Sequence, residues 1–409
     1  MDPLTKNRVW RVTDRRRCPQ GGRHFYSYWP LWNQNGKYLL VQCEGWSLVR
    51  PDSAMLLIRD SDLRVIKNVL EEMPAGVGAG KLFWSWVDAD TLYALQGSKL
   101  LAWNPFRSRG RVLKDFSQTR VGDLPVAHFD LAYVSFDDRY VLVNLLGDNP
   151  RTRGKDEWEP LGLLSYDRQT GGLAILDLTR FAAYDEAVFT KDNHVWVLAD
   201  LGQGFRGLRY TLDFREHSVV SSPGHHAHGL LPDGTPVTIK AASNRDCPAG
   251  SKSGNPVDKG YPDTGWKPTA VILDVSGARR EHLDADSKEP ILWKLGCHVP
   301  GQHNFDHFSW NNAQQDQFFI STAAYGNPEA DPLANAILRV RLRFRPDGSI
   351  ADDEIDVLAY HRSGRDYWAQ PRVSCNQQGT RCLFASSMVN NAGNRDPQAN
   401  LYIVDVPAK

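Results

Sequence analysis

The chain repeats one pattern of polar and apolar positions, in which a polar turn rich in Asp, Asn or Gly precedes a short apolar strand. Strands joined by such turns are typical of β-hairpins. Seven copies occur, on average about 58 residues apart, which is near the repeat length of propeller blades. The copies are residues 33–42, 88–95, 136–143, 191–198, 232–239, 312–320 and 376–384.

A second hairpin signal follows each copy. One runs from residues 54–60 into 64–66, and another runs from residues 162–167 into 173–176. Two hairpins in each repeat give a four-stranded blade. The sequence therefore predicts an all-β fold, a seven-bladed β-propeller, with an irregular pair of β-sandwiches as the alternative.

The two ends of the chain predict how the ring closes. Residues 400–406 supply only the third strand of the seventh repeat, and residues 8–13 form a strand before the first repeat. We expect the N-terminal strand to join the last blade, because this leaves no open edge. The chain is then a single domain over residues 1–409. A polar, Gly/Pro-rich loop around 241–266 is inserted in blade five, and such loops often carry function.

Composition and charge limit the partners. Lys and Arg together number 48, and Asp and Glu together also number 48, so the formal net charge is zero. The chain therefore lacks the basic excess that is typical of a nucleic-acid binder. No apolar run approaches the roughly 18 residues of a membrane span, so we expect no membrane partner. The N-terminus has no signal-peptide pattern, which predicts a cytoplasmic protein, or a periplasmic or secreted one if the chain is a trimmed mature form. We expect a monomer or a small homo-oligomer.

The six cysteines are too few for a disulfide scaffold. Cys18 and Cys43 fit as ordinary small apolar residues. Cys375 and Cys382 flank a hairpin turn, where they are candidate cross-strand neighbours. We expect buried thiols at these two positions rather than a bridge.

Histidines gather where the predicted blades begin. The first strand of each blade lines the central channel, so the residues that enter this strand ring one mouth of the channel. Imidazole is the usual general base near neutral pH and the commonest metal ligand. Eight of the twelve histidines fall at or just before these positions, six of them in the adjacent blades five and six. The eight are His24, His128, His225, His226, His228, His298, His303 and His307.

A metal site is one interpretation of this cluster. Imidazole and amide donors together suit Mn, Zn or Ni, and the donor set alone does not choose among these metals. A structural zinc is a separate prediction, because Cys247 and Cys297 bracket the blade-five loop near the same histidines. The candidate ligands of the metal site in the histidine cluster are His226 or His228, His303 or His307, and Gln370.

A metal-free acid/base pair is the second interpretation. In it, His128 or His226 faces Tyr184 or Tyr367. The third interpretation is that the histidines only fill the channel and bond to neighbouring blades. A Gly-x-Ser-x-Gly elbow, a phosphate loop and a dinucleotide fingerprint are all missing from the sequence, which argues against the chemistries that use them.

Arginine and aromatic residues at the same mouth indicate an acidic sugar as the ligand. Arg372 enters blade seven, and Arg206 precedes a strand of blade four. A planar guanidinium binds a carboxylate through two parallel hydrogen bonds. Aromatic rings offer flat surfaces on which sugars stack. The residues expected to bind substrate are His24, Tyr26, Trp84 and Trp368.

Three blade starts resemble those of bacterial propeller polysaccharide lyases, namely the oligogalacturonate lyases and the ulvan lyases. They are Gly-His-His-Ala-His-Gly-Leu-Leu-Pro-Asp-Gly at 224–234, Asp-His-Phe-Ser-Trp at 306–310 and Gln-Pro-Arg-Val-Ser at 370–374. The likeness covers most of the chain as architecture, but only these segments as motifs.

The resemblance to oligogalacturonate lyases implies a manganese ion held by three His and one Gln, together with a catalytic Arg and a further His. The spacing of Gln302 and His307 departs from the close Gln-x-x-His-x-His run of that family. The metal ligands would be His226, His303, His307 and Gln370. The residues near the uronate would be Arg372 or Arg206, and His128.

The resemblance to ulvan lyases implies a His base, a Tyr acid, an Arg on the carboxylate and a structural zinc, for which Cys247 and Cys297 are the candidates. Both families imply β-elimination on a uronic-acid-containing oligo- or polysaccharide. We therefore predict a carbon–oxygen lyase whose partner is an acidic glycan. The alternatives are a non-catalytic propeller that binds a glycan or a protein, and a metal-dependent hydrolase or isomerase.

Overall fold

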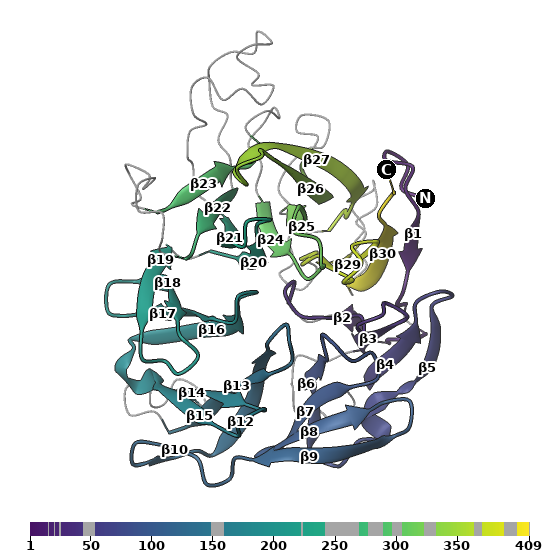
Figure 1. Cartoon of the computed structure of the whole chain (residues 1–409). Helices are drawn as coiled ribbons and strands as arrows, with labels where there is room; N and C mark the ends of the chain where they lie inside the picture. Colours follow the sequence, from purple (N-terminus) through teal and green to yellow (C-terminus); the bar gives the residue numbers. More distant parts are fainter. Residues whose placement is uncertain are drawn as a thin grey trace. The chain divides into compact units, whose positions relative to one another are not determined.

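Seven four-stranded antiparallel sheets follow one another along the chain, which confirms the predicted seven-bladed β-propeller (Figure 1). No α-helix occurs in the part of the chain that the computed structural model describes. That part comprises residues 1–14, 16–19, 21–23, 26–43, 54–148, 159–221, 224–241, 270–276, 289–296, 305–322, 333–363, 370–387 and 399–408.

Each blade is an up-and-down meander, and the strands of the first four blades lie in chain order. Blade 1 contains β2 (Gly22–Arg23), β3 (Tyr38–Cys43), β4 (Ala54–Arg59) and β5 (Arg64–Asn68). Blade 2 contains β6 (Val77–Trp84), β7 (Leu92–Gln96), β8 (Lys99–Asn104) and β9 (Arg109–Asp115). Blade 3 contains β12 (His128–Val134), β13 (Tyr140–Gly147), β14 (Glu159–Asp167) and β15 (Leu173–Asp177). Blade 4 contains β16 (Ala183–Phe189), β17 (Val195–Asp200), β18 (Phe205–Tyr210) and β19 (His217–Ser221).

The last three blades include the closure that the sequence predicts. Blade 5 contains β20 (His226–Leu230), β21 (Pro236–Ala241), β22 (Ala270–Asp274) and β23 (Ile291–Lys294). Blade 6 contains β24 (Phe305–Ser309), β25 (Gln317–Thr322), β26 (Ala336–Phe344) and β27 (Ile350–Tyr360). Blade 7 contains β28 (Ser374–Cys375), β29 (Arg381–Ser386), β30 (Asn400–Asp405) and the N-terminal β1 (Val9–Arg11). Because Trp10 pairs with Ile403 in an antiparallel ladder, the predicted closure by the N-terminal strand is confirmed.

Small elements complete the described chain. The strands β10 (Arg120–Val121) and β11 (Leu124–Pro125) form a two-stranded ribbon. Two short 3₁₀ helices are η1 (Val69–Glu71) and η2 (Leu178–Arg180). No helix in the described residues has the length and apolarity to cross a lipid bilayer. The blade-five loop predicted around 241–266 lies outside the described residues beyond Ala241.

The chain divides into two compact units. Unit 1 comprises Met1–Trp46, Ile58–Val65 and Gly224–Lys409, and unit 2 comprises Ser47–Leu57 and Ile66–Pro223. The single domain over 1–409 remains a prediction. Unit 1 holds blades 5, 6 and 7 and the start of blade 1, and these are the parts on which the candidate site is built.

Burial decreases from the middle strands of a blade to its outer strand. Every residue of β25 is buried, because both faces of this strand pack inside unit 1, whereas β9 in unit 2 is mostly exposed. In unit 1 the side chains between blades 5 and 6 form one apolar core that includes Ile239, Phe305 and Leu338. This core holds the first strands of the two blades in place.

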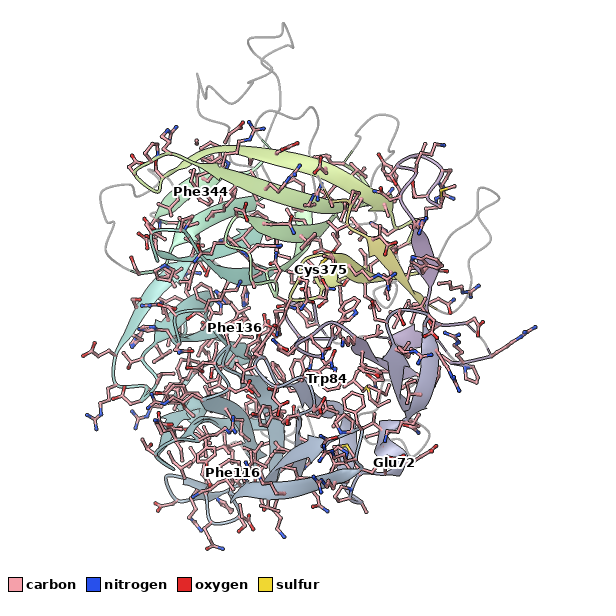
Figure 2. All side chains as sticks on the ribbon, turned by 45° about the vertical axis from the view of Figure 1, so that its right-hand side comes forward. Glu72, Trp84, Phe116, Phe136, Phe344 and Cys375 are labelled. Atoms are coloured by element: carbon pink, nitrogen blue, oxygen red, sulfur yellow. A yellow bond between two sulfur atoms is a disulfide. The ribbon has the colours of Figure 1, made fainter. Side chains whose placement is uncertain are left out.

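Two disulfide bonds correct the cysteine predictions. Cys375 and Cys382 are cross-strand neighbours in β28 and β29, as expected, but they are bonded to each other (Figure 2). Cys18 and Cys43, which we expected to be small apolar residues, form the second bond. All four are buried, and because a half-cystine and a thiol fill the same apolar space, the surrounding pattern does not separate them.

Candidate functional site

The candidate site lies where β20 and β24 begin, in adjacent blades of unit 1 (Figure 1). The two strands approach closely at Gly229, where a Cβ atom would lie 2.5 Å from the Trp310 ring. Only glycine permits this packing of β20 against the end of β24. The close approach brings His225, just before β20, next to His307 in β24.

A β-bulge aims the side chains of β24. The pairing with β25 shifts register between Phe305 and His307, so Asp306 is the extra residue on this strand. Bulges redirect side chains and are frequent beside active sites. Here the shift allows two consecutive residues, Asp306 and His307, to face the same histidine of blade 5.

The carboxylate of Asp306 joins two imidazoles. Nδ1 of His225 lies 2.8 Å from Oδ1 of Asp306, and Nδ1 of His307 lies 3.0 Å from Oδ2. The two imidazole rings stack, with centroids 4.0 Å apart. The His225 side chain is 39% exposed and that of His307 is 1% exposed, so His225 is the imidazole that a ligand reaches.

An aromatic residue and a guanidinium border this cluster. The Tyr26 ring meets the His307 and His225 rings edge-on, with centroids 5.2 and 5.9 Å apart. The guanidinium carbon of Arg372 lies 5.4 Å from the centre of the Tyr26 ring, and Nη2 of Arg372 lies 3.5 Å from Oε1 of Gln370. Blades 1, 5, 6 and 7 therefore all contribute to the site.

Arg372 has a left-handed backbone, with φ of +40°. Non-glycine residues with positive φ are uncommon, and strained backbone is concentrated at functional sites. The backbone turn at Arg372 lies two residues before β28, and the guanidinium lies over Tyr26. We interpret the strain as the cost of aiming this side chain.

Burial and hydrogen bonds set the charges of the cluster. Burial alone would raise the pKa of Asp306, but hydrogen bonds from His225 and His307 outweigh it and hold this pKa well below its usual range. Burial lowers the pKa of His307 to about 4, despite the opposing hydrogen bond to Asp306. Asp306 is therefore ionised and His307 neutral near pH 7.

His226 and His228 form a second pair on β20. Their ring centroids are 5.0 Å apart, and Nδ1 of His228 lies 2.7 Å from the Thr238 hydroxyl oxygen. Both side chains are buried, and burial lowers the pKa of His226 to about 4. The ring of His226 stacks with that of Tyr28 at 6.1 Å.

A further buried histidine, His361, gives a prediction on pH and stability. In the neutral form Nε2 donates to the Thr322 carbonyl at 2.9 Å, and Nδ1 accepts from the Ser363 N–H at 3.1 Å. Burial lowers the pKa of His361 to about 4, below the roughly 6.5 of an unfolded chain. Between these values the unfolded state binds more protons, so this contribution to stability falls as the pH falls. We expect His361 to account for a loss of about 2 kcal/mol between pH 8 and pH 5.

Urea unfolding of the wild type and of His361→Gln at several pH values measures this loss. The variant lacks the titrating group, so the stability difference between the two proteins should narrow by that amount on acidification. A difference that stays constant from pH 8 to pH 5 would show that His361 titrates normally in the folded protein.

The His225–Asp306–His307 cluster fits a divalent metal ion. One donor atom from each residue can be chosen so that all three lie within 4.8 Å of one another. Nε2 of His307 is buried and has no hydrogen-bond partner among the described residues, which is an arrangement that a metal ligand would explain. Two imidazoles and a carboxylate are a donor set that Zn and Mn accept.

Four of the predicted site residues lie in unit 2, where each has its own contacts or burial. The hydroxyl of Tyr184 donates to Oδ1 of Asn144 at 2.8 Å, and burial raises the pKa of this tyrosine. Arg206 donates to the Phe205 carbonyl at 2.8 Å, and His128 begins β12. Trp84 is fully buried and therefore has no ring face for a sugar, so we correct its assignment from substrate binding to core packing (Figure 2).

Several predicted residues cannot be placed in the site. They lie outside the described residues, so their roles remain predictions. They are His24, His303, Tyr367, Trp368, Cys247 and Cys297.

The sequence pattern predicted His225 at the mouth of the central channel, but it indicated no role for His225 or for Asp306. The structure makes these two residues the partners of His307. Oε1 of Gln370, a predicted metal ligand, lies 3.5 Å from Nη2 of Arg372, and its role as a ligand remains a prediction. The signal for Asp306 was its position directly before a histidine at a blade start, but the bulge that turns both side chains to one side is not visible in the sequence.

Comparisons with known proteins support the fold. No protein-family model matches the chain, and no curated protein matches it. An oligogalacturonate lyase from Vibrio parahaemolyticus is similar in structure, with a TM-score of 0.59 and 14% sequence identity over 100% of this chain and 96% of that one. The dipeptidyl peptidase 4 of Porphyromonas gingivalis has a TM-score of 0.41 and 11% identity, over 87% of this chain and 48% of that one. At 14% identity the likeness to the lyase establishes the β-propeller fold alone.

Proposed function

We propose that this protein is a polysaccharide lyase that cleaves uronic-acid-containing oligo- or polysaccharides by β-elimination. The observation that carries the proposal is that the Asp306-bound imidazole of His225 and the guanidinium of Arg372 both lie against the ring of Tyr26. A base and a carboxylate-binding cation are the two groups that this reaction needs. The structural likeness to an oligogalacturonate lyase agrees with the proposal.

The base is His225. Its Nδ1–H donates to Asp306, which fixes the tautomer and leaves Nε2 able to accept a proton. In the reaction Nε2 takes the proton at the carbon next to the carboxylate. The electron pair of that C–H bond forms the new double bond, and the bond from the neighbouring carbon to the glycosidic oxygen breaks.

Arg372 pairs with the uronate carboxylate in this scheme. Removal of the neighbouring proton moves negative charge onto the carboxylate, and a fixed cation stabilises charge where it develops. Tyr26, which packs edge-on against both imidazoles, is the candidate donor of the proton to the leaving oxygen. The base His128 or His226 with the acid Tyr184 or Tyr367 remains a prediction for the same reaction.

A divalent ion, Mn or Zn, is part of the proposal. His225, Asp306 and His307 would hold it, with Gln370, His226 and His303 as the further predicted ligands, and the predicted His128 would then be the base, because an imidazole bound to a metal does not take the proton. When bound, the ion supplies a second positive charge for the uronate carboxylate. The structural zinc at Cys247 and Cys297 remains a separate prediction.

We further propose that the protein works in an oxidising compartment, the periplasm or the cell exterior. Cys18–Cys43 and Cys375–Cys382 support this, because disulfides persist where thiols are not kept reduced. An acidic polysaccharide outside the cytoplasm is the substrate that such a location would supply.

An assay on a panel of uronate polymers tests the proposed function. Each elimination leaves an unsaturated uronate at the new end, which absorbs in the near ultraviolet. We expect one or more polymers to give this absorbance. Fragments that instead gain a water in mass spectrometry would identify a hydrolase, and tight binding without any product would identify a glycan-binding propeller. Either result would overturn the proposal.

A further inference from the structure

The aromatic part of the site, Tyr26 and Tyr28, lies on backbone outside the strands of the described residues. In blade 1, β2 ends at Arg23 and β3 begins at Tyr38, and Tyr26 and Tyr28 lie between them. Within this stretch the backbone makes a turn, in which the Trp29 N–H donates to the Tyr26 carbonyl at 2.9 Å. A turn alone does not fix where Tyr26 lies relative to the histidines of blades 5 and 6.

One buried amide reaches this stretch from blade 6. Asn311 follows the end of β24, four residues after His307, and is 5% exposed. Its Nδ2 lies 3.1 Å from the Ser27 carbonyl oxygen and 3.2 Å from the Trp29 carbonyl oxygen. Both acceptors belong to the turn that carries Tyr26 and Tyr28.

A serine of blade 7 also takes part in the hydrogen bonds around Asn311. Nδ2 of Asn311 also lies 3.2 Å from Oγ of Ser374, and this hydroxyl donates to the Trp29 carbonyl at 3.0 Å. Ser374 begins β28, two residues after Arg372. A single side chain therefore connects the segments that carry Tyr26, His307 and Arg372.

We propose that Asn311 is a positioning residue that holds Tyr26 against the His225–Asp306–His307 cluster. It touches no reacting atom itself and acts through the turn of blade 1. Its amide donates to buried carbonyls that strand pairing does not satisfy. Without it the Ser27 carbonyl loses this donor and the Trp29 carbonyl depends on the Ser374 hydroxyl, and loss of a donor to a buried acceptor is costly. The catalytic consequence rests on the proposed function, whereas the structural consequence does not.

Asn311→Leu tests this role, and Asn312→Leu is its matched control. Both side chains are buried amides at neighbouring positions. Nδ2 of Asn312 instead bonds within blade 6, to Gln314 Oε1 and to the Gln317 carbonyl, each at 2.9 Å. The control thus loses buried hydrogen bonds as well, and these two run within blade 6.

Hydrogen exchange of a peptide that covers residues 26–32 is the first readout. We expect exchange there to become at least about tenfold faster in Asn311→Leu, because the turn opens locally, and to stay near the wild-type rate in Asn312→Leu. Ser374→Ala removes only one donor and should give a smaller change in the same peptide. Equal protection of this peptide in Asn311→Leu and Asn312→Leu would overturn the inference, and Ser374→Ala provides the comparison if Asn311→Leu does not fold.

Steady-state kinetics on the uronate polymer that the wild type cleaves is the second readout. Displacement of Tyr26 should lower kcat about tenfold with little change in KM, whereas a general loss of stability would reduce the amount of active enzyme in both variants alike. If the wild type cleaves none of the polymers, the proposed function fails, and the exchange experiment still decides the role of Asn311.

Discussion

Asp306→Asn should lower kcat for uronate elimination by about 10²–10⁴-fold, the range that a positioned acid/base group contributes. Oδ1 of the carboxylate accepts from Nδ1 of His225 at 2.8 Å, and Oδ2 lies 3.0 Å from Nδ1 of His307. An amide of the same size accepts through one oxygen only, and its NH₂ group faces one of the two Nδ1 atoms. His225 keeps the backbone carbonyl of Asp306, 3.0 Å from Nδ1, as an acceptor, but it loses the nearby negative charge that stabilises the imidazolium formed when Nε2 takes the proton. Initial rates of ultraviolet absorbance at saturating substrate measure the effect.

Asp347→Asn is the control for this variant, because Asp347 lies in an exposed turn where it accepts from Ser349. Its kcat should match the wild-type value. Bound Mn or Zn, measured by elemental analysis, should also fall in Asp306→Asn if the cluster holds the ion. A variant that keeps both its kcat and its metal would remove Asp306 from the mechanism.

The propeller could be predicted because its signals are local. Each polar turn and the strand after it lie within about ten residues, so a repeat such as 191–198 predicts β17 without knowledge of the rest of the chain. Prediction of the last blade needed only one contact between residues far apart in the sequence, the pairing of β1 with β30. The seventh repeat has only three strands of its own, and this indicated that pairing.

The site could be predicted only in part, because it depends on side-chain directions. The repeat placed His225, His226 and His307 at blade starts. The bulge at Asp306 and the glycine contact at Gly229 then decide which histidines meet. Neither feature has a sequence signature. The same limit explains Trp84, since an aromatic residue near a blade start has the same pattern whether it faces the channel or the core.

The disulfides show another limit of the sequence pattern. Cys18 lies in a loop and Cys43 ends β3, 25 positions later. Their bond depends on how this loop folds back on the strand, and no spacing rule contains that information. Cys375 and Cys382 were correctly placed opposite each other, and only their redox state was wrong.

Arg372→Met should lower kcat/KM on a uronate polymer by about 10²–10³-fold, the loss expected when one fixed group that stabilises developing charge is removed. The guanidinium lies over Tyr26, and its charge helps to keep the pKa of His307 low. Methionine keeps much of the length of the side chain but has no donor for a carboxylate. Arg372→Lys should recover only part of the rate, because an ammonium does not reproduce the two parallel hydrogen bonds of a guanidinium.

Arg343→Met is the matched control for Arg372→Met, because Arg343 is 64% exposed and its Nη2 lies 3.7 Å from a carboxylate oxygen of Glu354. A comparison of Arg372→Met with Asp306→Asn then separates the two cations that the uronate carboxylate can meet. If Arg372 binds the carboxylate, Arg372→Met loses activity while its bound metal is unchanged. If the ion alone binds it, Arg372→Met keeps wild-type kcat/KM, and only Asp306→Asn and metal removal abolish the reaction. That second outcome would contradict the role proposed for Arg372.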